Sequence, residues 1–483
     1  MKKINKRTNG GVIVSFFQGI AKIKGLPDVF LHENILDRSG NAIGIVIGYN
    51  EEFVEALIFK ESFTSDERVF AGGETFSLHI SDKIIGRTID GLGNAVDDLG
   101  PVQGESFPVF RPSPQIIDRD PVDTPVSTGI KIIDTALPLG RGQRELIIGD
   151  RKLGKSTLAL DVVLNQKRAE LPMICVYVIC GQKRQKLEEI LNIFEKTNAF
   201  LYTVVVAATA GASFGELYLA PFVGCAIGEY FRDQGKDALV VYDDLSKHAK
   251  AYRDIALLLE RAPGREAYPG DIFSLHAGLL ERAAKLSRKK GGGSLTALPV
   301  IETQEGDISS FIPTNLISIT DGQIYFERGL FQKGFLPAVN IGLSVSRIGS
   351  KAQPGPLKQI TAGIRLALSQ HRELQKLAQL ETAKSEEAKK SIYRGELLLE
   401  LLKQEKHTNI TWEEQTVLFY TVEEGFFEDL DKSEWRRFEK LFIDLLRNRY
   451  FEILSSIKKD GFTGETKEKI KGIVIDFKAE FLS

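Results

Sequence analysis

The chain has 483 residues, and its 63 Lys and Arg residues nearly balance its 65 Asp and Glu residues. A net charge of −2 gives no global basic field for nucleic acid, and no run approaches the roughly 18–20 apolar residues of a membrane span. The three cysteines form no Cys-x-x-Cys pair, which argues against a disulfide framework or a zinc site. These features predict a cytoplasmic protein of several domains that meets a membrane only indirectly, at the cytoplasmic face of the cell membrane and through a larger complex.

Residues 1–80 carry short β-rich runs that glycines separate. The runs lie at 11–14, 20–23, 42–47 and 54–59. A regular succession of short strands with turn residues between them is typical of a small barrel. The sequence therefore predicts an N-terminal β-barrel, and the near-neutral charge of the chain predicts no nucleic-acid partner.

Residues 81–357 alternate apolar strand-like runs with helical patterns. The clearest runs lie at 146–148, 174–179, 202–206 and 239–242. This alternation predicts an α/β fold, a P-loop (RecA-like) domain with a parallel sheet and helices on both faces. Residues 358–483 are rich in Leu, Lys and Glu, and the leucines at 397, 398, 401 and 402 have helical spacing, which predicts a C-terminal helical domain.

A complete phosphate-binding loop follows the first of these central runs. Its spacing, G-x4-G-K-[ST], lets consecutive backbone N–H groups surround a triphosphate at the N-terminus of the next helix, predicted at 156–166. A lysine in the loop reaches the β- and γ-phosphates, and a serine hydroxyl binds Mg²⁺. The predicted nucleotide-binding residues are Gly149, Asp150, Arg151, Lys152, Leu153, Gly154, Lys155, Ser156 and Thr157.

A carboxylate ends a later apolar run, 238–242. In a parallel sheet such a strand end meets the phosphates, so Asp243 is predicted to hold Mg²⁺ together with Ser156. The predicted cofactors are ATP or ADP and Mg²⁺.

Four segments carry a family resemblance. They are Gly-Arg-Gly-Gln-Arg-Glu-Leu-Ile-Ile-Gly-Asp-Arg at 140–151, Tyr-Asp-Asp-Leu-Ser-Lys at 242–247, Pro-Gly-Arg-Glu-Ala-Tyr-Pro-Gly-Asp at 263–271 and Ser-Ile-Thr-Asp-Gly-Gln at 318–323. Together they resemble the alpha subunit of F-type rotary ATPases from about residue 10 to the C-terminus. The resemblance implies a three-plus-three ring with catalytic beta-type subunits around a gamma-type shaft.

The resemblance also assigns roles to single residues. Gln182 stands where the catalytic beta subunit has a glutamate that polarises the attacking water, which implies a site that binds nucleotide without hydrolysing it. Residues 340–350 resemble the segment that sends an arginine into the neighbouring beta site, so Arg347 is the predicted finger. Ser344 matches a serine that the family needs for activity; its alternative is a hydroxyl that only bonds local backbone.

Two departures from the family pattern carry expectations of their own. On the adenine side, Leu336-Pro337 replaces Arg-Pro, and of two expected glutamines Gln404 is present while the other is Lys406. Pro337 and Gln404 are the predicted contacts there, with base selectivity left open. The match begins at Gly10 without the usual leader helix, which predicts an ATP hydrolase lacking a conventional stator and resembles divergent F-type-like ATPases.

Two other functions remain as alternatives. A hexameric RNA-translocating ATPase has a similar core, and its barrel would need aromatic and basic stacking positions, for which Phe16, Phe17 and Phe30 are candidates. A structural subunit would instead keep its nucleotide permanently bound. RNA-stimulated ATPase activity and nucleotide exchange during turnover separate these alternatives from a regulatory subunit.

Overall fold

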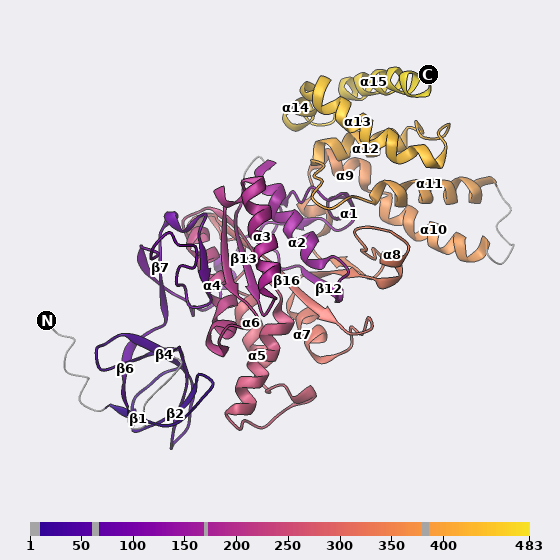
Figure 1. The fold of residues 1–483 in the computed structure, drawn as a ribbon. Coiled ribbons are helices and arrows are strands. Elements are labelled where there is room, and N and C mark those ends of the chain that lie inside the picture. The colour runs from indigo at the N-terminus through magenta and orange to yellow at the C-terminus, as the bar shows by residue number, and fades with distance from the viewer. Residues whose placement is uncertain (1–9, 60–66, 169–171, 379–385) are drawn as a thin grey trace.

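The computed structural model describes residues 10–59, 67–168, 172–378 and 386–483. Three parts follow one another across the molecule, with the barrel and the last helices at opposite ends of the central sheet domain (Figure 1). The predicted fold class is confirmed, whereas the domain limits at residues 80 and 357 stay predictions. Among the described residues, no helix is both long and apolar enough to cross a membrane.

Six antiparallel strands close the barrel in the order β1-β2-β5-β4-β3-β6. The strands are β1 Gly11–Phe17, β2 Ile20–Lys24, β3 Glu33–Leu36, β4 Ala42–Tyr49, β5 Val54–Ile58 and β6 Arg68–Thr75. Alternate side chains such as Ile23, Ile35 and Val46 fill the interior. The sequence did not reveal β3 and β6, because β3 has only four residues and β6 contains two consecutive glycines, Gly72 and Gly73.

Eight strands form the central sheet in the order β18-β17-β12-β16-β15-β13-β14-β8. They are β8 Thr88–Asp90, β12 Leu146–Asp150, β13 Ile174–Cys180, β14 Thr203–Ala208, β15 Asp237–Asp243, β16 Ser294–Thr303, β17 Gly322–Phe326 and β18 Val345–Ser346. The sheet is parallel as predicted except at one edge, where the two-residue strand β18 runs antiparallel to β17. Two small sheets join β7 Ser77–Ile80 to β9 Glu105–Pro108 and β10 Pro125–Val126 to β11 Leu139–Gly140.

Helices cover both faces of this sheet, because its side chains alternate between two apolar cores. One core includes Ile147 and Tyr177 and packs under the helices α1 to α3, whereas the other includes Ile148 and Val178 and packs under α4 to α7. The helices are α1 Lys131–Ala136, α2 Lys155–Asn165, α3 Arg184–Thr197, α4 Phe214–Asp233, α5 Leu245–Leu258, α6 Ile272–Leu280, α7 Phe311–Ile319 and α8 Arg328–Gln332.

The C-terminal helices share the first of these cores. Leu397, Leu398, Leu401 and Leu402 are buried in it, as their spacing predicted. The helices are α9 Gly355–Thr361, α10 Ile364–Ala378, α11 Glu386–Leu402, α12 Trp412–Glu423, α13 Trp435–Arg449, α14 Phe451–Asp460 and α15 Gly464–Leu482. A buried ion pair between Lys131 and Glu439 adds a polar tie between α1 and α13. The helical part is therefore packed firmly behind the segments that surround the phosphate loop.

Candidate nucleotide-binding site

The phosphate loop joins the end of β12 to the start of α2, as the sequence predicted. Two glycines allow its path. Gly154 has φ 100°, in the left-handed region that favours glycine. A Cβ on Gly149 would lie 2.6 Å from the carbonyl oxygen of Phe326 on β17. The loop can therefore turn sharply against the neighbouring strand and leave its backbone N–H groups at the N-terminus of α2.

Two polar residues brace this loop from within. The Lys155 Nζ donates to the carbonyl oxygen of Asp150 at 2.6 Å, and burial lowers the pKa of Lys155 while the nearby carboxylates oppose that shift. The Asp150 carboxylate accepts from Thr303 Oγ1 and from the Gly306 N–H, both at 2.7 Å, and pairs with Arg328 at 3.0 Å. Although burial raises it, these contacts bring the pKa of Asp150 below its usual value. Asp150 thus ties the loop to neighbouring segments of the chain.

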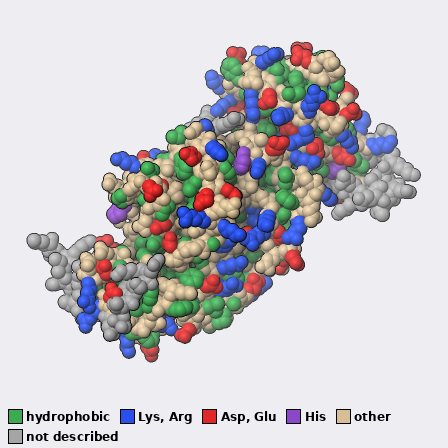
Figure 2. Space-filling view, viewed as in Figure 1, with side chains coloured by type: hydrophobic (Ala, Val, Ile, Leu, Met, Phe, Trp, Pro, Cys, Tyr) green, Lys and Arg blue, Asp and Glu red, His purple; other side chains and the backbone are tan. Residues whose placement is uncertain are grey.

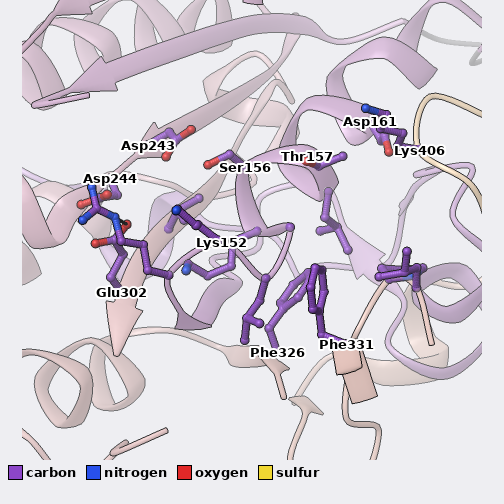
Figure 3. A pocket seen from close by; sticks show the side chains of 18 of the residues that line it. Lys152, Ser156, Thr157, Asp161, Asp243, Asp244, Glu302, Phe326, Phe331 and Lys406 are labelled. Atoms are coloured by element: carbon purple, nitrogen blue, oxygen red, sulfur yellow. Dashed lines mark ion pairs between the residues drawn. The ribbon is translucent and has the colours of Figure 1, made fainter. Parts of the chain in front are cut away.

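A cavity of about 790 Å³ opens beside the loop. Its walls include most of the predicted nucleotide-binding residues but not Gly149 or Asp150, the first two residues of the loop. The predicted residues that line it are Arg151, Lys152, Leu153, Gly154, Lys155, Ser156, Thr157, Gln182, Asp243, Pro337 and Gln404. Figure 3 shows two distinct ends: Asp243, Asp244 and Glu302 lie at one, and Asp161 and Lys406 lie at the other.

Gln182 joins two carboxylates at the acidic end. Its Nε2 donates to Asp243 Oδ1 at 2.9 Å and to Asp244 Oδ2 at 3.3 Å, while the Tyr177 hydroxyl donates to Asp243 Oδ2 at 3.0 Å. Burial raises the pKa of Asp244 to about 6, although Lys247 lies beside it. An amide suits this place because it donates to both acids, whereas a glutamate would add a third carboxylate.

The residues present fit a nucleotide with Mg²⁺. The backbone N–H groups of the loop and the ammonium group of the buried Lys155 can donate to phosphate oxygens. Ser156 and Asp243 provide oxygen ligands for Mg²⁺. Within the described ranges, no group of three or more His, Cys, Asp or Glu side chains is arranged to hold a metal by itself. Magnesium commonly binds through one or two carboxylates plus phosphate oxygens, so this arrangement suits it. When bound, the ion neutralises phosphate charge.

The other end of the cavity uses its predicted glutamine differently. Gln404 Oε1 accepts from the Lys131 N–H at 2.9 Å, and Nε2 donates to the carbonyl oxygens of Gly129 and Thr408, both at 2.8 Å. Its amide therefore joins two backbone segments that form the wall of the cavity. Gln404 can therefore contact a nucleotide base directly only through the remaining lone pair of its Oε1 atom, and otherwise it shapes the wall that the base meets.

Three polar residues at this end were not predicted from the sequence as site residues. Asp161 and His407 were not identified, and Lys406 was noted only as a departure from the family pattern. Asp161 and Lys406 line the cavity, and His407 Nδ1 lies 2.8 Å from Asp161 Oδ1. Asp161 is four residues beyond Thr157 on α2, so helical spacing from the loop could have placed it on the cavity side. Lys406 and His407 could not be placed that way, because their loop is about 240 residues away in the sequence.

The remaining predicted residues lie elsewhere. Ser344 is buried; its hydroxyl donates to the carbonyl oxygen of Asn340 at 2.7 Å and accepts from the Tyr325 N–H at 2.9 Å. Arg347 directly follows the edge strand β18, and its side chain is exposed. Neither residue lines the cavity. The structure thus divides the predicted residues between an internal cavity and an edge of the sheet.

Comparisons with known proteins agree with this architecture. The nucleotide-binding domain of the ATP synthase alpha/beta family matches residues 129–346, and the C-terminal domain of the ATP synthase alpha/beta family matches residues 353–477. The ATP synthase subunit alpha of Aquifex aeolicus is 46% identical over 98% of this chain and 94% of its own length. Those of Caldanaerobacter subterraneus (45%; 98% and 93%) and Clostridium botulinum (43%; 99% and 95%) are similar. The protein belongs to the ATP synthase subunit alpha family.

Family membership confirms the resemblance drawn from the four sequence segments, and this family binds nucleotide. Membership of this family argues against the alternative function as an RNA-translocating ATPase. Figure 2 shows Lys, Arg, Asp and Glu side chains of the described residues on the same face, with several Lys and Arg side chains gathered near its middle. The separate roles of Gln182, Ser344 and Arg347 remain predictions.

Proposed function

We propose that this protein is a non-catalytic, regulatory subunit of a rotary ATPase. Its own cavity holds ATP or ADP with Mg²⁺ and does not hydrolyse it. The observation that carries this proposal is the contact of Gln182 with both Asp243 and Asp244 at the acidic end of the cavity. An amide has no proton-accepting step near neutral pH, so it cannot serve as the general base for a water.

The proposal extends to the neighbouring subunit. Relatives of this protein are named ATP synthase subunit alpha, and we propose that it alternates with three beta-type subunits around a gamma-type shaft. In such a ring Arg347 projects from the sheet edge into the catalytic site of the neighbour. There its guanidinium stabilises the charge that spreads over the transferred phosphoryl group. The cytoplasmic location and the direction of the motor stay predictions.

The purified subunit offers the first test. It should bind Mg-ATP in a calorimeter and show no sustained release of phosphate. Lys155→Ala serves as a control, since any genuine turnover by this cavity must disappear with the loop lysine. Turnover by the single subunit that Lys155→Ala abolishes would falsify the non-catalytic assignment.

Two further measurements address the alternatives. Addition of single-stranded RNA should leave the ATPase rate of the reconstituted ring unchanged; stimulation would favour a translocase. Labelled nucleotide in this subunit should exchange during turnover of the ring. Retention of the label over many turnovers would instead show a permanently bound, structural nucleotide.

A further inference from the structure

A buried acid lies close to the edge strand that precedes Arg347. Glu145 stands immediately before β12 and is fully buried. Its Oε2 accepts from Gln143 Nε2 at 2.7 Å, while its Oε1 has no hydrogen-bond partner among the described residues. Burial raises the pKa of Glu145 well above its usual value, against the opposing effect of the Gln143 hydrogen bond. A buried carboxyl with one unpaired oxygen is costly when charged, so the neutral acid is the favoured form.

The carboxyl packs against the strand pair β17–β18. A Cβ built on Gly322 of β17 would lie 2.6 Å from Glu145 Oε2 and 2.1 Å from the carbonyl oxygen of Val345. Gly322 is also the residue that pairs with Ser346 in the β17–β18 register. A glycine is therefore required at this point for the acid to approach the strand pair so closely.

One amide connects the acid to the residue before Arg347. Gln143 is fully buried, and its Nε2 lies 2.7 Å from Glu145 Oε2 and 3.2 Å from Ser346 Oγ. Its Oε1 accepts from the Gly140 N–H at 2.8 Å. With both ends of the amide engaged, Gln143 has one orientation that satisfies all three partners.

A second set of contacts holds the arginine's own backbone. The Arg347 N–H donates to the carbonyl oxygen of Asp321 at 2.9 Å. Arg144 in turn binds the Asp321 carboxylate through Nε at 3.0 Å and Nη2 at 2.7 Å. Residues 143–145 thus contact both Ser346 and the segment that receives the Arg347 N–H.

We propose that Glu145 is a positioning residue for Arg347. By accepting from Gln143, Glu145 fixes one of the groups that hold the Ser346 hydroxyl, together with Pro138 and Gly349, and so helps to set the direction in which Arg347 leaves β18. An acid in its neutral form suits this role because it accepts the hydrogen bond without placing a bare charge in the core. The inference rests on the proposed function of Arg347 as a finger. A shift of about 1 Å in a catalytic group can cost roughly 10²-fold in rate, so small errors of direction matter.

The test uses rings reconstituted with beta-type and gamma-type subunits. Glu145→Leu removes the acceptor and keeps an apolar side chain of similar bulk, whereas Glu145→Gln keeps an uncharged acceptor. We expect Glu145→Leu to lower kcat by roughly 10²-fold with KM nearly unchanged. Glu145→Gln should keep most of the wild-type kcat. Ile147→Val, a conservative change in β12 that leaves the acid in place, is the matched control and should keep normal kcat.

A double-mutant cycle separates positioning from general damage. In rings that carry Arg347→Ala, addition of Glu145→Leu should cause no further loss of kcat, because the group that Glu145 directs is already gone. A further large loss, weaker ATP binding in this subunit's own cavity, or a Glu145→Gln defect equal to that of Glu145→Leu would overturn the inference.

Failure of the proposed function gives a different pattern. If Arg347→Ala rings keep their turnover, the finger role itself is wrong and this inference falls with it. If Arg347→Ala rings lose turnover while Glu145→Leu rings keep theirs, the finger stands and the positioning role alone is wrong.

Discussion

Three predicted functional side chains of the cavity are buried or hydrogen-bonded, whereas that of Arg347 at the edge of the sheet is exposed. In the cavity, Gln182 and Asp243 are hydrogen-bonded to other groups of the same subunit, and Lys155 is buried. At the edge, the backbone of Arg347 is held by Asp321, yet its guanidinium is exposed and has no ion pair with another described residue. This difference fits the proposal that the cavity binds its nucleotide within the subunit, whereas Arg347 serves a neighbouring subunit.

The largest effect should come from the edge. Arg347→Ala should assemble, leave nucleotide bound in the neighbour and lower ring turnover by roughly 10³–10⁵-fold. Arg347→Lys should do nearly as badly, because a point charge lacks the planar fork of guanidinium. Steady-state ATPase assays with nucleotide occupancy measured in parallel check this. Lys351→Ala, an exposed cation four residues further on, is the control and should keep its activity.

Loss of the loop lysine should affect the other region. Lys155→Ala removes a charged donor and leaves the nearby acids without their cation, so ATP affinity in this subunit should fall roughly 10²–10³-fold. Lys152 also lines the cavity but is exposed, so Lys152→Ala should have a much smaller effect. Calorimetry on the single subunit measures both. Equal losses in the two variants would show that the buried position of Lys155 does not matter.

The raised pKa of Asp244 predicts a pH dependence of stability. The pKa rises from 3.8 in the unfolded protein to about 6 in the folded protein, so the folded state binds this proton more tightly. The free energy of unfolding should therefore fall as pH rises from about 4 to 6, by up to about 3 kcal/mol, and stay level above 6. Urea titrations of wild type and Asp244→Asn check it. The variant should gain stability relative to wild type across that interval; a constant difference would contradict the assignment.

The smallest expected effect concerns Gln182. Gln182→Glu places a third carboxylate beside Asp243 and Asp244, which should lower the stability of the metal-free subunit by about 1–2 kcal/mol. Mg²⁺ should reverse much of that loss by neutralising the acids. Gln182→Ala removes the amide without adding charge, so its loss should not respond to Mg²⁺. Thermal denaturation with and without Mg²⁺ separates the two; identical responses would mean that charge is not the reason for the amide.

The sequence by itself determined the parts whose chemistry is local. The phosphate loop is eight contiguous residues whose spacing fixes a strand, a turn and a helix N-terminus, so Lys155 and Ser156 could be placed without the fold. Apolar runs also revealed β12, β13 and β15. The short strands β3 and β18 gave too few residues for a pattern to emerge, and their pairing depends on neighbours in space.

Only the tertiary structure decided which side chains remain available. Gln404 reads as a base contact in sequence, but its amide binds the backbone of Lys131, 273 residues away. In the sequence Glu145 is only one residue of a family motif. In the fold it packs against Gly322 and is linked to Ser346 through Gln143. The hydrogen bonds of a side chain are set by partners that the fold brings to it from distant positions. Local spacing carries no information about those partners, so it identified the loop but not the acid next to the edge strand.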